Sequence, residues 1–162
     1  MSKKGSDDTD NADFREIMEK YGDMIYRITL THTLDRNLAE DNFQETFLSL
    51  AMTGKEFENE EHLKRWLIRT AVNRCISCNR RSKLSGRISP DTISEESDTA
   101  VTELKILISD LPEKYRAVIY LCCFEGCTAR NAAEILGKRE GTVKSLLSRG
   151  RKLLKKELEE QA

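Results

Sequence analysis

Apolar residues recur every three or four positions along most of the chain, and short polar stretches divide them into separate runs. This spacing is typical of amphipathic helices, because it places the apolar side chains on one face. The first run lies within residues 13–34, the second follows a polar break at 35–37, and the third extends from about His62 to Arg81. Thr53 and Gly54 separate the second run from the third, so the first half of the chain is predicted to contain three helices.

Residues 84–100 lose this spacing and are rich in Ser, Thr, Asp and Glu, a composition typical of a flexible linker. Helical spacing then resumes in four short runs that continue to the end of the chain, and no strand-like alternation of useful length occurs. The predicted fold is therefore all-α, with two small helical domains joined by the linker. We assign a disordered tail to 1–12, the first domain to 13–83, the linker to 84–100 and the second domain to 101–162.

The most specific local pattern lies in the second domain, where a short helix from about Thr128 to Leu136 is followed by a turn at Gly137 and a longer basic helix. This arrangement predicts a helix-turn-helix, whose second helix must keep one face exposed to enter a major groove of DNA. The side chains expected on or beside that face are Lys144, Ser145, Ser148, Arg149, Arg151 and Lys152.

The net charge of −1 conceals an uneven distribution of charged residues. The segment 84–103 carries five acids and one Arg, whereas the segment 138–156 holds eight basic residues and a single acid, Glu140. A basic stretch of this kind is the electrostatic footprint expected of a nucleic-acid-binding surface. The alternative is a solvated amphipathic helix without a partner, and the helix-turn-helix pattern argues against it.

Other classes of protein find little support in the sequence. It contains no Gly-rich phosphate loop, no nucleophile elbow and no His paired with a nucleophile, so neither an enzyme nor a cofactor is expected. Cys75 and Cys78 suggest a metal or redox site, but His32 and His62 lie at no ligand spacing from them, so packed cysteines are expected. No apolar run could cross a membrane or form a signal peptide, which predicts a cytoplasmic protein.

Two sets of motifs resemble one known family. Residues 111–118 (Leu-Pro-Glu-Lys-Tyr-Arg-Ala-Val), 133–137 and 140–145 resemble region 4, the promoter-binding C-terminal domain of the extracytoplasmic-function (ECF) sigma factors. Residues 39–47 and 66–73, followed by Arg80 and Arg81, resemble region 2 of the same family. The two sets occur in the family's order and together span roughly residues 14–157, which is more specific than a helix-turn-helix alone.

The resemblance implies a function as a sigma factor, with core RNA polymerase, promoter DNA and an anti-sigma factor as partners. Region 4 would bind the −35 element through the six side chains of the basic helix named above. Region 2 would contact the polymerase clamp through Asp41, Gln44 and Glu45. It would capture a base of the −10 element with a loop and the helix after it, through Lys55, Glu56, Phe57, Glu58, Asn59, Arg69, Asn73, Arg74 and Arg80.

The sequence departs from the family pattern on the basic helix. Leu146 stands where an Arg is common, and Gly150 stands where an Ala is common. Leu146 is expected to remove a DNA contact, and a glycine inside a helix costs ~1 kcal/mol relative to Ala. Together they predict weaker or altered reading of the −35 element.

Two other classes stay open at this point. One is a helix-turn-helix regulator that binds duplex DNA without joining polymerase, and the other is a helical adaptor that binds only proteins. Promoter-specific transcription that requires core polymerase would separate a sigma factor from both.

Overall fold

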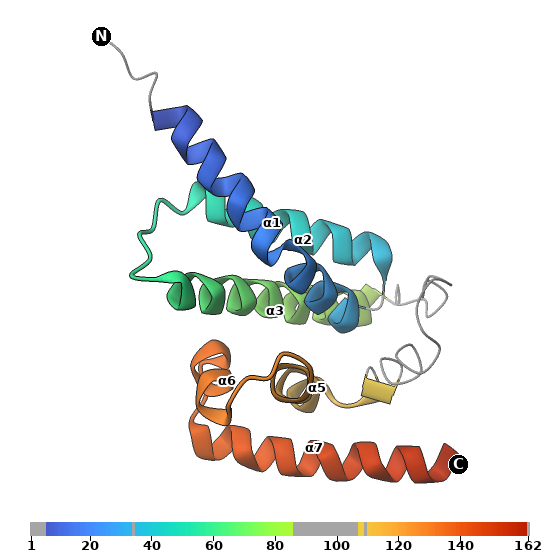
Figure 1. Ribbon diagram of the computed structural model, residues 1–162. Helices are drawn as coiled ribbons and strands as arrows, with labels where there is room; N and C mark the ends of the chain where they lie inside the picture. Colours follow the sequence, from blue (N-terminus) through green and yellow to red (C-terminus); the bar gives the residue numbers. More distant parts are fainter. Residues whose placement is uncertain (1–5, 34, 86–106, 109, 162) are drawn as a thin grey trace.

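The computed structural model describes residues 6–33, 35–85, 107–108 and 110–161, and every regular element among them is helical (Figure 1). The elements are α1 (Ser6–Thr33), α2 (Arg36–Met52), α3 (Glu60–Ser85), α5 (Glu113–Ile119), the π-helix η1 (Tyr120–Phe124), α6 (Ala129–Leu136) and α7 (Glu140–Gln161). The predicted all-α fold is confirmed. Most of the predicted linker lies outside the described residues.

The helix α1 begins at Ser6 and so includes residues 6–12, which the sequence analysis assigned to a disordered tail. The first residues of this helix are mostly polar. Extending an existing helix is much easier than starting one, so polar residues can continue a helix that apolar packing stabilises further along. Likewise, α3 runs to Ser85 and includes the first two residues assigned to the linker.

The helices α1, α2 and α3 pack around a core that includes Ile25, Ile28, Phe47 and Leu67, all of them buried. Local side chains define where the helices start. The Asp35 carboxylate accepts a hydrogen bond from the Leu38 N–H at 3.1 Å and caps α2, and the Asn59 side chain accepts one from the His62 N–H at 2.8 Å at the start of α3. These caps therefore fix where α2 and α3 begin.

The predicted helix-turn-helix is present in the C-terminal half. Thr128 Oγ1 accepts a hydrogen bond from the Asn131 N–H at 3.1 Å and caps α6, and Gly137 ends it with a φ of 65°. This left-handed backbone conformation is readily adopted by glycine, which lets the chain turn sharply into α7. Ala132, Ala133 and Ile135 of α6 and Val143 of α7 are buried, so the two helices brace each other.

Two departures from the family pattern have a packing role in this structure. Gly150 is buried, and a Cβ at this position would lie 3.1 Å from Ile119 Cγ1 and 3.3 Å from Tyr115 Cβ, so the glycine lets α7 approach α5 closely. Leu146 is partly buried and packs against the core from the inner face of α7. Its side chain points into the protein and takes part in packing, while the loss of a DNA contact at this position stays a prediction.

The two helical groups share one core. Figure 1 shows α3 facing α5 and α6, with α7 on the far side of them. The contiguous buried cluster contains Leu67, Ile68 and Val72 of α3 together with Val118 and Leu121 from the C-terminal half. The sequence predicted two small helical domains joined by a linker, and the structure shows apolar surface of both buried together. This burial removes the surface from water, which is the main favourable term in folding.

A buried polar junction lies beside this shared core. The Arg116 guanidinium donates hydrogen bonds to the carbonyl oxygens of His32 and Leu111, each at 3.2 Å. The His32 carbonyl belongs to the last turn of α1, where the helix dipole favours a cation. The His32 ring is itself buried and contacts the Tyr120 ring edge to face, with ring centroids 5.4 Å apart. Arg116 therefore connects the start of the C-terminal domain to the end of α1.

We predict that His32 makes the protein less stable at acidic pH. Burial, and to a lesser degree the nearby Arg116 charge, lower the pKa of His32 to about 4, so the folded protein resists the proton that an unfolded histidine takes up near pH 6.5. The free energy of unfolding should fall as the pH drops from 6.5 towards 4, by up to about 3 kcal/mol from this residue. Urea denaturation at several pH values measures it.

The matched control for this prediction is the second histidine, His62, which is partly exposed. His32→Asn should flatten the pH dependence below pH 6.5 by more than His62→Asn does. An equally steep loss of stability in His32→Asn would contradict the assignment.

Candidate nucleic-acid and polymerase interfaces

The outer face of α7 is basic and exposed. Lys144, Ser145, Ser148 and Arg149 are all exposed, while Val143 on the inner face is fully buried. The Lys144 ammonium lies 3.0 Å from the Glu140 carboxylate one turn earlier, an exposed pair that contributes little energy and leaves the lysine available. The sequence-predicted DNA-facing residues therefore share one accessible surface at the start of the second helix of the helix-turn-helix.

The two remaining residues of this set, Arg151 and Lys152, are also exposed further along α7. Arg151 lies beside η1, where its Nη2 atom is 4.0 Å from the Cys123 sulfur. This position suits a contact with the DNA backbone better than a contact with a base, because it lies beyond the turn that would enter a groove.

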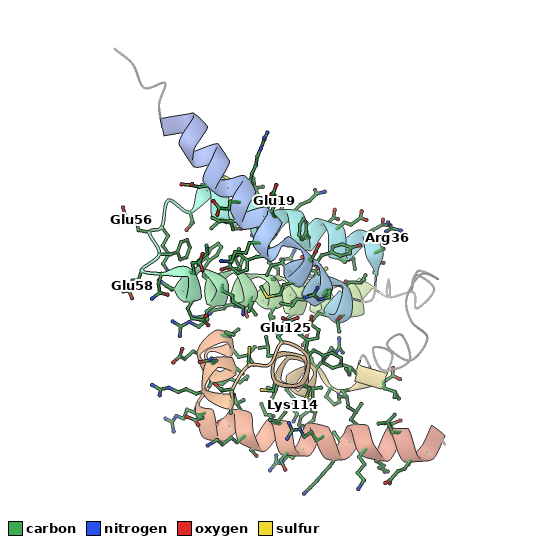
Figure 2. All side chains as sticks on the ribbon, in the orientation of Figure 1. Glu19, Arg36, Glu56, Glu58, Lys114 and Glu125 are labelled. Atoms are coloured by element: carbon green, nitrogen blue, oxygen red, sulfur yellow. The ribbon has the colours of Figure 1, made fainter. Side chains whose placement is uncertain are left out.

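The loop that connects α2 and α3 carries an aromatic anchor. The Phe57 ring packs edge to face against Trp66, with centroids 5.6 Å apart, and against His62, at 5.3 Å. Glu56 and Glu58 extend outward from this loop (Figure 2), and Lys55 is exposed beside them. The Asn59 side-chain oxygen is occupied by the α3 cap, so its amide nitrogen is the part that remains to meet a base. Trp66 is partly buried, as expected of a residue that packs inward.

The residues of α3 that are predicted to face the single DNA strand differ in exposure and in their partners. Arg69 and Asn73 are exposed. Arg74 instead reaches across to α2, where its guanidinium donates to Ser49 Oγ at 2.5 Å and lies 3.6 Å from the Glu45 carboxylate. Arg74, which was predicted to contact DNA, is thus paired with Glu45, which was predicted to contact polymerase. The side chain of Arg80 lies outside the described part of the structure.

A polar hollow of about 610 Å³ lies between α2 and α3 near these side chains. Asn42 is nearly buried there, and its amide nitrogen has no hydrogen-bond partner. Sequence periodicity did not single out Asn42, because an asparagine between apolar positions looks like part of a solvated face. The other lining residues are Glu45, Thr70, Asn73, Arg74, Ser77, Cys78 and Arg81.

The outward face of α2 combines acidic and apolar side chains. Asp41, Gln44 and Glu45 are exposed, and Leu48 and Met52 continue the same stripe with 50% and 76% of their surface exposed. The sequence analysis missed the two apolar residues. Their spacing would have placed them on this face, because Leu48 lies four positions after Gln44 and Met52 lies seven positions after Glu45. Exposed apolar side chains rimmed by polar ones are typical of protein interfaces.

The cysteines form no evident reactive centre in the described part of the chain. Cys75 is buried, and burial raises the pKa of its thiol to about 12, so the thiolate needed for metal binding or redox exchange is disfavoured. Burial also raises the pKa of Cys122 and Cys127. Among the described residues, no group of three or more His, Cys, Asp or Glu side chains is arranged to hold a metal ion, and no helix has the length and apolar character to span a bilayer.

Comparison with known proteins agrees with this arrangement of surfaces. Residues 17–84 match the family model for sigma-70 region 2, and residues 103–154 match that for sigma-70 region 4. The ECF RNA polymerase sigma factor SigM of Bacillus subtilis is 32% identical over 150 residues, which cover 86% of this chain and 91% of SigM. SigW of the same organism is 30% identical, with 96% of this chain and 92% of SigW covered.

Solved structures show the same fold at lower sequence identity. RpoE of Bartonella quintana, crystallised with the anti-sigma factor NepR, superposes with a TM-score of 0.75 at 23% identity, covering 91% of this chain and 97% of RpoE. CnrH in complex with the cytosolic domain of CnrY gives 0.72 at 18% identity, with 92% and 89% covered. The chain belongs to the sigma-70 family and, within it, to the ECF sigma factors.

We predict that Lys144→Ala and Arg149→Ala weaken binding to duplex promoter DNA. The loss should be ~1–3 kcal/mol for a bidentate contact with a base and smaller for a contact with phosphate only. A lost phosphate contact should also make the salt dependence of binding shallower. Titrations at several salt concentrations measure both effects, with Arg36→Ala, which removes an exposed charge from α2, as the control. Unchanged binding in both α7 variants would refute this role for α7.

Proposed function

We propose that the chain is a sigma factor that joins core RNA polymerase in the cytoplasm and directs it to promoters, without catalytic activity of its own. The observation that best supports this function is the presence, in one chain and in family order, of regions 2 and 4 with SigM and SigW as full-length relatives. A regulator that only binds DNA would need the exposed basic face of α7. It would have no use for the mixed acidic and apolar stripe on α2, which suits a protein partner.

We propose that each surface binds a different promoter element or partner. The basic face of α7 would bind the −35 element, with Lys144, Ser145, Ser148 and Arg149 in the groove and Arg151 and Lys152 at the backbone. The loop at 55–59 and the exposed Arg69 and Asn73 would bind the unpaired −10 strand, since polar loops and basic tracks suit single-stranded DNA.

On α2, Asp41, Gln44 and Glu45 would contact the polymerase, with Leu48 and Met52 as apolar anchors. Arg74 would act mainly as a support for this face, because its guanidinium already holds Glu45 and Ser49.

We also propose an anti-sigma factor as a partner. RpoE, which shares this fold, was solved with the anti-sigma factor NepR, and CnrH, which also shares it, was solved with the cytosolic domain of CnrY. An inhibitor that inserts between the two helical groups would have to disrupt the shared core, and it would offset that loss by touching both groups at once. Affinity purification from uninduced native cells tests this partner, and recovery of core polymerase alone would count against it.

Selection from a random promoter library tests the function itself. The protein mixed with core polymerase should transcribe a small set of templates that share −10 and −35 elements, and neither component should do so alone. Transcription that requires a different sigma factor, together with tight duplex binding by the free chain, would support the DNA-binding regulator instead. Absence of both activities would favour a helical adaptor.

The exposed positions of the α2–α3 loop should determine preference for the −10 base. We predict that replacing Lys55, Glu56 and Glu58 with the residues of another family member changes the preferred base while polymerase binding stays intact. Phe57 and Asn59 are kept, because they anchor the loop and cap α3. Competitive transcription across the four bases at each −10 position measures the preference.

A matched control for this exchange lies on α1. Arg15, Glu16 and Glu19 are exposed and have the same charges as the exchanged residues, so replacing them should leave the base preference unchanged. An unaltered preference after the loop exchange would mean that the loop is only a connector.

A further inference from the structure

Arg65 lies on α3 between the loop at 55–59 and Arg69, on the side that faces the C-terminal domain. Its guanidinium forms a salt bridge with the carboxylate of Glu134, on the first helix of the helix-turn-helix. Arg65 and Glu134 are 69 positions apart in sequence, so this ion pair joins the two domains directly. The sequence analysis named neither residue, because only the packing of the domains brings them together.

The surroundings of this pair are those of a site for a negatively charged strand. A hollow of about 230 Å³ lies between α3, α6 and the loop, and it is lined by Lys55, His62, Arg65, Trp66, Arg69, Glu134 and Ile135. Arg69 also reaches the helix-turn-helix, since its Nη2 atom lies 3.5 Å from where a Cβ on Gly137 would be. Three cations thus border the hollow, and Glu134 is the one acid among its lining residues.

The basic and aromatic residues of the hollow match the needs of single-stranded DNA. Guanidinium groups bind phosphate through paired hydrogen bonds in the same way that they bind carboxylate, so one arginine can accept either partner. Aromatic side chains beside such cations provide stacking surfaces for bases. A phosphate oxygen could therefore replace the Glu134 carboxylate on the Arg65 guanidinium.

We propose that Arg65 is a further promoter-contacting residue of region 2, and that Glu134 of region 4 occupies its guanidinium until the −10 strand displaces it. This inference rests on the proposed function, because it assumes that the strand binds along the loop and α3. The −35 surface on α7 stays exposed in the same state, so the two DNA-binding surfaces differ in accessibility. Within the −10 surface, Arg69 and Asn73 are exposed, whereas Arg65 becomes available only when Glu134 on α6 moves away from it.

The size of the effect follows from the nature of the ion pair. Both side chains are partly exposed, at 33% for Arg65 and 44% for Glu134, so the pair is worth no more than a surface salt bridge. The apparent affinity for the strand falls in proportion to the fraction of open molecules. Removing the carboxylate should therefore tighten strand binding about two- to fivefold.

The test compares two variants that break the same ion pair. Glu134→Gln frees Arg65 and should tighten binding of a fluorescein-labelled single strand that carries the −10 sequence obtained by promoter selection. Arg65→Gln also breaks the pair but removes the proposed DNA contact, so it should weaken binding and make its salt dependence shallower, by about 0.7 in the logarithmic slope per phosphate.

The single tryptophan of the chain reports the interface independently of DNA. Trp66 lines the hollow beside Arg65 and Glu134, so water should reach it more easily when α6 moves away. Both variants should shift its fluorescence emission to longer wavelength. Arg36→Gln and Glu40→Gln provide matched controls, because they break a surface pair at the start of α2 without touching the hollow.

The possible results separate the two parts of the proposal. Tighter strand binding in both variants would show that the pair only holds the domains together, and would overturn the contact between Arg65 and DNA. Unshifted Trp66 emission in both variants, with unchanged strand binding, would overturn the masking by Glu134. Failure of the proposed function would give a different result. No variant would then transcribe with core polymerase, although the Trp66 emission would still shift. The proposed contact between Arg65 and the promoter would be abandoned together with the function.

Discussion

The arrangement of the whole molecule depends on α3 having two buried sides. Leu67, Ile68, Ala71 and Val72 are each almost fully inaccessible, and together they cover about 140° of the helix circumference, wide enough to meet neighbours from two directions. One side packs against α1 and α2, and the other packs against the C-terminal helices. Because the same helix also carries the exposed Arg69 and Asn73, the surface proposed for DNA and the surface that joins the domains are adjacent strips of one element.

Polar contacts at the edge of this interface specify the relative orientation of the two domains, which apolar packing alone does not. Arg116 is buried, so its hydrogen bond to the His32 carbonyl at the end of α1 replaces water that it would otherwise have kept. Nearby, Glu125 accepts a hydrogen bond from Tyr120 at 2.8 Å, and Arg27 of α1 lies 4.0 Å from the same carboxylate. Apolar burial alone would tolerate sliding of one domain over the other, whereas these paired groups are satisfied in one relative orientation only.

The sequence was informative where function depends on short-range patterns and less so where it depends on packing between domains. Apolar spacing predicted the helices, and Gly137 located the turn of the helix-turn-helix. The salt bridge between Arg65 and Glu134 could not be predicted, because nothing in either local sequence refers to the other. The packing roles of Leu146 and Gly150 were missed for the same reason: a comparison of residue types suggested a lost DNA contact and a cost in helix stability, and gave no sign that both positions face α5 and the core.

The π-helix η1 has a geometric consequence for the domain that follows it. Its hydrogen bond from the Glu125 N–H to the Tyr120 carbonyl, at 3.2 Å, spans five residues instead of four, so this turn accommodates one residue more than an α-helical turn. Each residue of an α-helix turns the chain by about 100°. Removing that residue would rotate everything after Phe124 by roughly this angle, and α6 and α7 would then present different faces to α3 and to solvent. The extra residue therefore determines how α6 and α7 are rotated relative to the first half of the protein.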